Sequence, residues 1–251
     1  MLRHRSRAIR FLKLGSVGAF IAAVPLLLIT INVRWVVNSP VLYSYGFDKY
    51  DIPYWTGIER DELLSAGRQI RDYFNNDAEL LDLRVELAGV TRSLYNAREV
   101  AHMKDVKGLV QGVYLVQELA AAYILVFVAA AFWSTRRRFL PSLGRHVATG
   151  SAATIGLILV VGLGSLVGFD RLFLAFHVVS FSNDLWQLDP SRDYLIAMFP
   201  EGFFFDATMW VALSTVAEAL LLAVAPLFFL WWRPRHARRQ TVPKPVPQPA
   251  A

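Results

Sequence analysis

Four apolar runs divide this sequence and constrain its fold more than any other feature. They cover residues 11–33, 109–133, 148–168 and 207–232. A helix needs about 20 predominantly apolar residues to cross the hydrocarbon core of a bilayer, and each run meets that length. The first run is too long for the apolar part of a cleaved signal peptide, so a retained helix is expected. The sequence therefore predicts an integral membrane protein, mainly α-helical, with four transmembrane helices.

Arginine and lysine are concentrated in three segments beside these runs. They lie at the N-terminus, in the loop at residues 134–147 and in the tail at residues 233–251, which is also rich in proline. Because basic flanks are retained in the cytoplasm, both termini and this loop are expected on that side. The same arrangement accounts for the net charge of +6, so nucleic acid is not expected as a partner.

The alternation of sides leaves two segments outside the cytoplasm. The expected order is a basic N-terminus with the first transmembrane helix (1–33), an extracytoplasmic cap (34–108), the second helix (109–133), a basic cytoplasmic loop (134–147), the third helix (148–168), a second extracytoplasmic segment (169–206), the fourth helix (207–232) and a basic, Pro-rich cytoplasmic tail (233–251).

The first extracytoplasmic segment is long enough to fold as a small domain. Residues 41–47 are rich in β-branched and aromatic types, which favours a strand. Residues 56–75 show helical periodicity, and Thr56 followed by Glu59 predicts a capping box at the start of this helix.

The rest of this segment predicts a hairpin followed by a helix. Residues 82–95 suit two short strands that turn at Ala88 and Gly89. Residues 96–107 read as a helical segment that leads into the second transmembrane helix. The cap is therefore expected to be α+β, and to lie on the surface of the bilayer.

His102 and His177 are the strongest candidates for chemistry. The other histidines lie within the basic segments, whereas these two lie just before the second apolar run and shortly after the third. Both therefore fall near the outer membrane interface, at the same predicted depth. Imidazole exchanges protons near neutral pH, which suits acid–base catalysis. The alternative, that each ring packs under the cap and bonds to a backbone carbonyl, stays open.

Carboxylates near these histidines are candidates to orient them. Asp105 lies three residues after His102, on the same face of a helix, and Asp189 follows His177. Histidine and aspartate also bind zinc, but no ligand spacing here indicates a metal site. The sequence lacks cysteine, a P-loop and a G-x-S-x-G elbow. No metal and no cofactor are therefore expected.

Glu118 and Glu218 lie inside the second and fourth apolar runs. A carboxylate within a membrane is energetically costly and is a functional candidate for that reason, although a hydrogen-bonded structural role is the other interpretation. Two further functions stay open on these grounds. One is a non-enzymatic scaffold whose cap binds a partner, and the other is a proton-coupled transporter that uses these two carboxylates.

Two stretches resemble a bacterial family of membrane proteins, the lipoprotein intramolecular transacylases. Residues 94–107 (LYNAREVAHMKDVK) carry HMKDVK before a transmembrane run. Residues 176–205 (FHVVSFSNDLWQLDPSRDYLIAMFPEGFFF) carry FH followed by W-x-x-DP-x-x-D-x-L-I-x-x-FP-x-x-FF. The second motif is the more specific, because it fixes many residue types at set intervals.

The resemblance implies an acyltransferase with four transmembrane helices under an extracellular cap, in a bacterial cytoplasmic membrane. The family's enzyme moves the sn-2 acyl chain of a diacylglyceryl lipoprotein to the α-amine of that lipoprotein's N-terminal cysteine, which gives the lyso-form. Two histidines carry this reaction without a covalent acyl-enzyme, and they match His102 and His177. The family's H-x-x-F-F pattern has Ser180 in place of one aromatic, which affects acyl-chain packing.

The expected partners are thus the diacylglyceryl lipoprotein and the lipid bilayer, while acyl transfer to another lipid stays open. His102 is predicted to be the base, because Asp105 is placed to orient it. Candidates to contact the polar glyceryl-cysteine region are Tyr95, Asn96 and Arg98. Candidates to line the acyl path, which also suit interfacial anchoring or the core of the cap, are Trp186, Phe199, Phe203 and Phe204.

Overall fold

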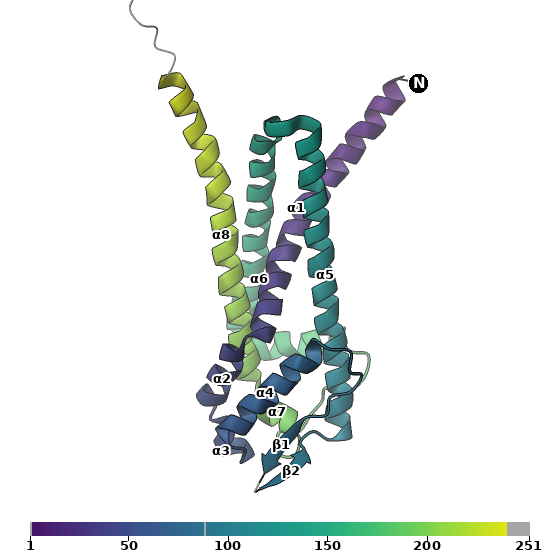
Figure 1. The fold of residues 1–251 in the computed structure, drawn as a ribbon, viewed down its shortest axis with the longest axis vertical. Coiled ribbons are helices and arrows are strands. Elements are labelled where there is room, and N and C mark those ends of the chain that lie inside the picture. The colour runs from purple at the N-terminus through teal and green to yellow at the C-terminus, as the bar shows by residue number, and fades with distance from the viewer. Residues whose placement is uncertain (1, 88, 240–251) are drawn as a thin grey trace, which may run out of the picture.

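The protein is an elongated helical bundle with a small folded region, the cap, at one end (Figure 1). The computed structural model describes residues 2–87 and 89–239, so the end of the predicted Pro-rich tail lies outside it. Among the described residues, four helices are long and apolar enough to cross a membrane, which confirms the predicted transmembrane helices. They are α1 (Leu2–Asn38), α5 (Ala97–Thr135), α6 (Leu140–Ser180) and α8 (Glu201–Arg239).

The basic segments gather at the end of the bundle that is opposite the cap. The start of α1, the far end of α8 and the connection between α5 and α6 all lie there (Figure 1). That connection is a short 3₁₀ helix, η1 (Arg136–Phe139). The arrangement agrees with the predicted topology, and the side of the membrane that each end faces remains a prediction.

The cap is built mainly from the chain between α1 and α5. Its core buries Phe47, Leu63, Leu83 and Met198, each fully or almost fully enclosed. The elements of the cap are α2 (Pro40–Lys49), α3 (Ile52–Thr56), α4 (Arg60–Phe74), β1 (Arg84–Leu87), β2 (Val90–Ser93) and α7 (Tyr194–Met198).

The predicted strand at residues 41–47 is wrong, because this stretch is helix α2. Its buried side chains include Tyr43 and Phe47, four residues apart, which is the spacing of one helical face. Pro40 stands at the start of α2, where its missing N–H costs nothing. Packing of this face into the cap core therefore outweighs the strand preference of β-branched and aromatic residues.

The helix predicted at residues 56–75 is confirmed as α4, but the predicted capping box is wrong. Thr56 ends the preceding helix α3 and donates its hydroxyl hydrogen to the Ile52 carbonyl, 2.7 Å away. Gly57, at φ 67°, then reverses the chain, and α4 begins after Glu59 without a side-chain cap. A capping box does form at the start of α5, between Asn96 and Glu99.

The predicted hairpin is confirmed. β1 and β2 pair antiparallel, with Arg84 opposite Ser93 and Leu87 opposite Val90. Gly89 adopts a positive φ of 78° in the turn, a conformation that favours glycine, and Ala88 lies outside the described residues.

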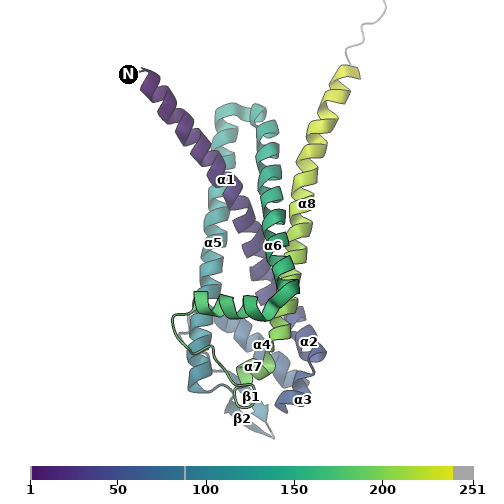
Figure 2. The ribbon, with the colours of Figure 1, turned by 180° about the vertical axis from the view of Figure 1, so that it is seen from behind.

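The third long helix does not stop where the third apolar run ends. At Gly168 the backbone leaves helical geometry, and α6 continues to Ser180 after this kink. Figure 2 shows the segment after the kink running across the end of the bundle rather than along it. We call residues 169–180 the α6 arm. It carries His177 beneath the cap, close to the start of α5.

Candidate active site

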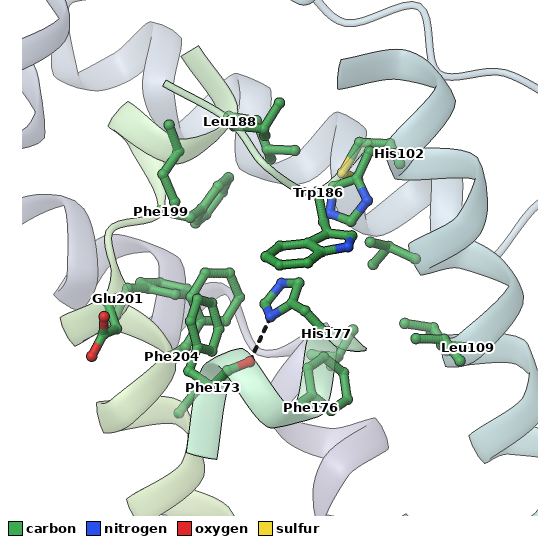
Figure 3. Close-up of a pocket in the computed structure, with 18 of the residues that line it drawn as sticks. His102, Leu109, Phe173, Phe176, His177, Trp186, Leu188, Phe199, Glu201 and Phe204 are labelled. Atoms are coloured by element: carbon green, nitrogen blue, oxygen red, sulfur yellow. Dashed lines mark hydrogen bonds between the residues drawn. The ribbon is translucent and has the colours of Figure 1, made fainter. Parts of the chain in front are cut away.

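A cavity of about 890 Å³ lies where the cap meets the bundle. Its walls come from α1, α5, the α6 arm and α8, from the cap helices α2, α4 and α7, and from the loop that follows the arm. Most of the lining is aliphatic or aromatic, and Figure 3 shows the aromatic side chains around the two histidines. The size and composition suit a lipid chain, since ligand cavities of this kind are mostly apolar with a few placed polar groups.

His102 enters the cavity from α5. The capping box at Asn96 and Glu99 fixes where this helix begins, and His102 lies in its second turn. The side chain is 6% exposed, and its Nδ1 has no hydrogen-bond partner among the described residues. Phe181 contacts the ring edge-on, with 5.0 Å between centroids. A buried polar atom without a partner is costly, so a partner supplied by a bound substrate would satisfy it.

His177 reaches the same cavity from the α6 arm. Its Nδ1 lies 2.7 Å from the Phe173 carbonyl oxygen, one helical turn earlier (Figure 3). A carbonyl only accepts hydrogen bonds, so Nδ1 carries the hydrogen. In the neutral ring Nε2 therefore holds the free lone pair. Aromatic rings surround this imidazole, with centroid distances of 4.4 Å to Phe173 and 5.1 Å to Trp186.

The two imidazoles lie face to face across the cavity. Their centroids are 6.3 Å apart and their planes differ by 30°. Along the chain, the rest of α5, η1 and most of α6 separate these two residues. The kink at Gly168 and the arm that follows it bring them together. The sequence left two interpretations of these histidines open, a part in acid–base chemistry and structural packing under the cap. His177 fits both, because it bonds a backbone carbonyl and also lines the cavity.

The loop after the α6 arm is fastened to α5 on both sides of His102. Arg98, four residues before His102, donates from Nη2 to the Asp184 carbonyl. Asp105, three residues after it, accepts a hydrogen bond of 2.9 Å from Asn183. Positions at these spacings lie on one face of a helix. Asp105 therefore holds the loop, and no hydrogen bond joins it to His102 among the described residues.

The start of α5 also holds the N-terminal end of α7. Asn96 donates to Asp193 at 2.9 Å, and the buried Glu99 accepts from the Leu195 backbone N–H at 2.6 Å. Asn96 thus holds the start of α7 against α5 and is not part of the cavity lining. Sequence reasoning missed Glu99, although the N-x-x-E spacing of a capping box at residues 96–99 was the available signal.

Of the remaining predicted site residues, Tyr95 lies outside the cavity and the others line it. Tyr95 is buried in the cap core and does not line the cavity, and its hydroxyl lies 3.8 Å from the Met198 sulfur. Asp189 lines the cavity, and hydrogen bonds from the Ser191 hydroxyl and N–H hold the pKa of its carboxyl below the usual value. The predicted acyl-path residues that line the cavity are Trp186, Phe199, Phe203 and Phe204.

Both carboxylates within the membrane-spanning helices are bonded to α1. Glu218 on α8 accepts a 2.8 Å hydrogen bond from Asn32, which is 2% exposed. Glu118 on α5 pairs with Arg34 at 3.4 Å. These contacts support the structural interpretation of the two residues, because each one links neighbouring helices.

The fold and the cavity define a multi-pass membrane protein with paired histidines at a lipid-sized apolar site. Residues 19–204 match the model of the family described as lipoprotein intramolecular transacylase Lit, and the chain belongs to that family.

Solved structures of Lit from Bacillus cereus share the fold. One superposes with a TM-score of 0.70 at 21% identity and covers 90% of this chain and 97% of the other. A variant with a histidine replaced by arginine gives 0.72 at 19% identity, covering 94% and 100%. A protein of Aquifex aeolicus (strain VF5), described as uncharacterized, is 24% identical over 180 residues, which is 72% of this chain and 78% of that protein.

Proposed function

We propose that this protein is the acyltransferase that converts a diacylglyceryl lipoprotein to its lyso-form. The sn-2 acyl chain moves from the glyceryl oxygen to the α-amine of the N-terminal cysteine of the same lipoprotein molecule. Membership of the family supports the reaction class. The observation that carries the proposal for the site is the pair His102 and His177, which face each other at 6.3 Å in an apolar cavity.

We assign the base role to His177 in place of His102, which the sequence suggested. The Phe173 carbonyl holds the hydrogen on Nδ1 of His177, which leaves Nε2 as the proton acceptor. Asp105, the residue expected to orient His102 as the base, is bonded to Asn183 instead. His177 is thus oriented as a base is in other acid–base sites, by a hydrogen bond to its second nitrogen.

The reaction then runs in two halves. His102 takes a proton from the α-ammonium group, which frees the lone pair of the nitrogen. The amine nitrogen attacks the sn-2 ester carbon, a C–N bond forms, and Nε2 of His177 takes a second proton from that nitrogen. The tetrahedral intermediate collapses, the C–O bond to the glyceryl oxygen breaks, and His102 gives its proton to that oxygen. Release of the proton on His177 to water restores both rings. Because amine and ester belong to one molecule, holding them together also lowers the entropic barrier.

The charge and shape of the site agree with this substrate. Asp170, Asp189 and Glu201 are among the cavity-lining residues, while lysine and arginine are absent from the lining in the described part of the chain. A negative potential favours approach of the cationic α-ammonium group of the lipoprotein. In this topology the cap lies outside the cytoplasm, where lipoproteins reside, and both termini lie inside.

Mass spectrometry of the N-terminal peptide of a reporter lipoprotein tests the proposal. Cells that contain the protein are expected to show the N-acyl lyso-form, and cells without it the diacylglyceryl form. His102→Ala and His177→Ala are each expected to lower the conversion rate by at least about 100-fold, since one proton-transfer role typically contributes 10²–10⁴.

His146→Ala is the matched control. This histidine lies at the other end of α6, where its ring packs edge-on against Phe20 at 6.4 Å. It is expected to leave conversion unchanged at equal expression. A diacylglyceryl form that persists in the presence of well-expressed wild-type protein contradicts the proposed reaction. Conversion that survives both site substitutions contradicts the histidine pair.

A further inference from the structure

Acyl transfer places negative charge on the ester carbonyl oxygen, and hydrogen-bond donors aimed at that oxygen lower the barrier. The cavity offers few such donors. Its lining contains neither lysine nor arginine within the described residues, so the side-chain donors are the two imidazoles, the Tyr43 hydroxyl, the Gln187 amide and the Trp186 indole. An oxyanion needs a donor whose hydrogen is not already bonded within the protein.

Three of the donors are already engaged, two of them fully. Tyr43 donates its hydroxyl hydrogen to the Val37 carbonyl at 3.0 Å, and Gln187 donates one of its two amide hydrogens to Asp184 at 3.3 Å. The Nδ1 hydrogen of His177 is bound to the Phe173 carbonyl. His102 has the separate task of protonating the leaving oxygen. The indole Nε1–H of Trp186 remains, and no hydrogen bond occupies it among the described residues.

Trp186 lies beside the reacting groups. Its ring packs on His177 with 5.1 Å between centroids and 37° between planes. In the view of Figure 3 the indole lies next to His177, with its nitrogen edge turned toward His102. The N–H therefore borders the part of the cavity that the two histidines share.

The loop that carries Trp186 is held in place at several points. Asn183 and Asp184, just before it, are bonded to Asp105 and Arg98 of α5. Directly after it, the Leu188 N–H donates to the Trp186 carbonyl at 2.9 Å. Because these anchors lie one helical turn on either side of His102, the indole is fixed relative to that histidine. Preorganised donors of this kind need no rearrangement as the charge develops.

We propose that Trp186 is a catalytic residue whose indole N–H stabilises the oxyanion of the tetrahedral intermediate. This inference rests on the proposed function. As the amine nitrogen bonds to the ester carbon, the π pair of the carbonyl moves to its oxygen, and Nε1–H donates a hydrogen bond to that oxygen without transferring its proton. The bond is released when the carbonyl re-forms and the glyceryl oxygen departs.

Two replacements separate the N–H from the aromatic ring in the purified enzyme. Trp186→Phe keeps an aromatic ring, and replacement of Trp186 by benzothienylalanine exchanges the N–H for sulfur in a ring of nearly the same shape. Each is expected to lower kcat by about 10- to 1000-fold, the range seen for loss of one oxyanion donor, with KM changed less than about threefold. Trp210→Phe is the matched control, since Trp210 stacks on Trp35 away from the cavity lining.

A substrate analogue with an ether at sn-2 completes the test, because it has no carbonyl to bind. Its affinity is expected to be equal in the wild type and in the benzothienylalanine variant. Wild-type kcat in that variant overturns the inference, as does an equal loss of turnover and of ether-analogue binding, which indicates a packing role. Inactive wild-type enzyme contradicts the proposed function itself, so the two failures are distinguishable.

Discussion

The cap and the bundle are both rich in apolar residues, but they use them in opposite ways. In the cap, Phe47 and Leu63 are completely enclosed by protein. In the bundle, Val167 and Leu221 are 91% and 72% exposed, and many other apolar side chains of the long helices are exposed too. The cap therefore has a core of its own, as a soluble domain has, whereas the apolar surface of the bundle is suited to contact with lipid.

The difference shows where the free energy of folding arises in each region. Burial of apolar side chains within the protein stabilises the cap. Between helices in a membrane that driving force is small, so packing of small residues and polar contacts such as Asn32 with Glu218 align them. The cavity lies at the boundary, with its cap side fixed by a rigid core and its bundle side by helices that contact lipid.

The largest expected effect comes from truncating the same residue type in the two regions. Leu63→Ala in the cap core is expected to destabilise the protein by about 2–5 kcal/mol, since it removes a fully buried side chain and leaves a cavity. Leu221→Ala on the outer face of α8 is expected to change the stability by less than about 0.5 kcal/mol. Unfolding free energies in mixed micelles measure both.

Equal costs for the two truncations would show that the bundle has a protein-packed core as the cap does, and would remove the contrast. Residual acyl transfer provides a second readout. Leu63→Ala is expected to lower the temperature at which activity is lost, whereas Leu221→Ala is expected to leave it unchanged.

The same contrast explains what the sequence predicts well. Transmembrane helices are recognisable because a bilayer requires a long apolar run, a constraint that acts locally along the chain. The proximity of His102 and His177 was predictable because topology places both at one membrane interface. The hairpin was found from the turn at Gly89, whose positive φ is a local requirement.

What sequence reasoning missed depends on distant contacts. Residues 41–47 form α2 because Tyr43 and Phe47 fill the cap core, which their β propensity does not reveal. The bond between Asp105 and Asn183 joins segments far apart in the chain, so the spacing of Asp105 from His102 suggested a different partner. The α6 arm continues the helix past the apolar run, and no local signal marked its direction.

A smaller effect is expected from the polar contact between α1 and α8. Asn32→Leu removes the hydrogen bond to Glu218 at a site that is 2% exposed, and is expected to destabilise the bundle by roughly 1 kcal/mol. The free energy of unfolding in mixed micelles, compared between the wild type and the variant, measures this effect. Thr30→Val is the matched control, because the Thr30 hydroxyl bonds within its own helix, to the Leu26 carbonyl at 2.6 Å.

The comparison of these two substitutions decides whether polar contacts align the helices. If Asn32→Leu is no more destabilising than Thr30→Val, the bond to Glu218 contributes nothing measurable, and alignment of α1 with α8 rests on packing alone. A greater loss in Asn32→Leu supports the distinction drawn between the two regions.

The smallest expected effect is a pH dependence that belongs to the surface of the cap. Arg60 binds both oxygens of Asp48, at 2.7 and 2.8 Å, and these hydrogen bonds hold the pKa of the Asp48 carboxyl below its usual value. A carboxyl whose pKa is lower in the folded state adds stability above its unfolded pKa of about 3.9, and that stability is lost as the pH falls through the folded pKa. Both side chains are about half exposed, which limits the contribution to less than about 1 kcal/mol.

Arg60→Gln isolates this contribution. The loss of stability on substitution is expected at pH 7 and is expected to disappear when wild type and variant are compared well below pH 4, where Asp48 is protonated in both. High salt is expected to reduce the effect at pH 7, because exposed ion pairs are screened. A difference between the two proteins that stays constant from pH 7 to acid would mean that Arg60 acts through its 2.9 Å hydrogen bond to the Ser44 hydroxyl, which holds α4 against α2 and does not titrate.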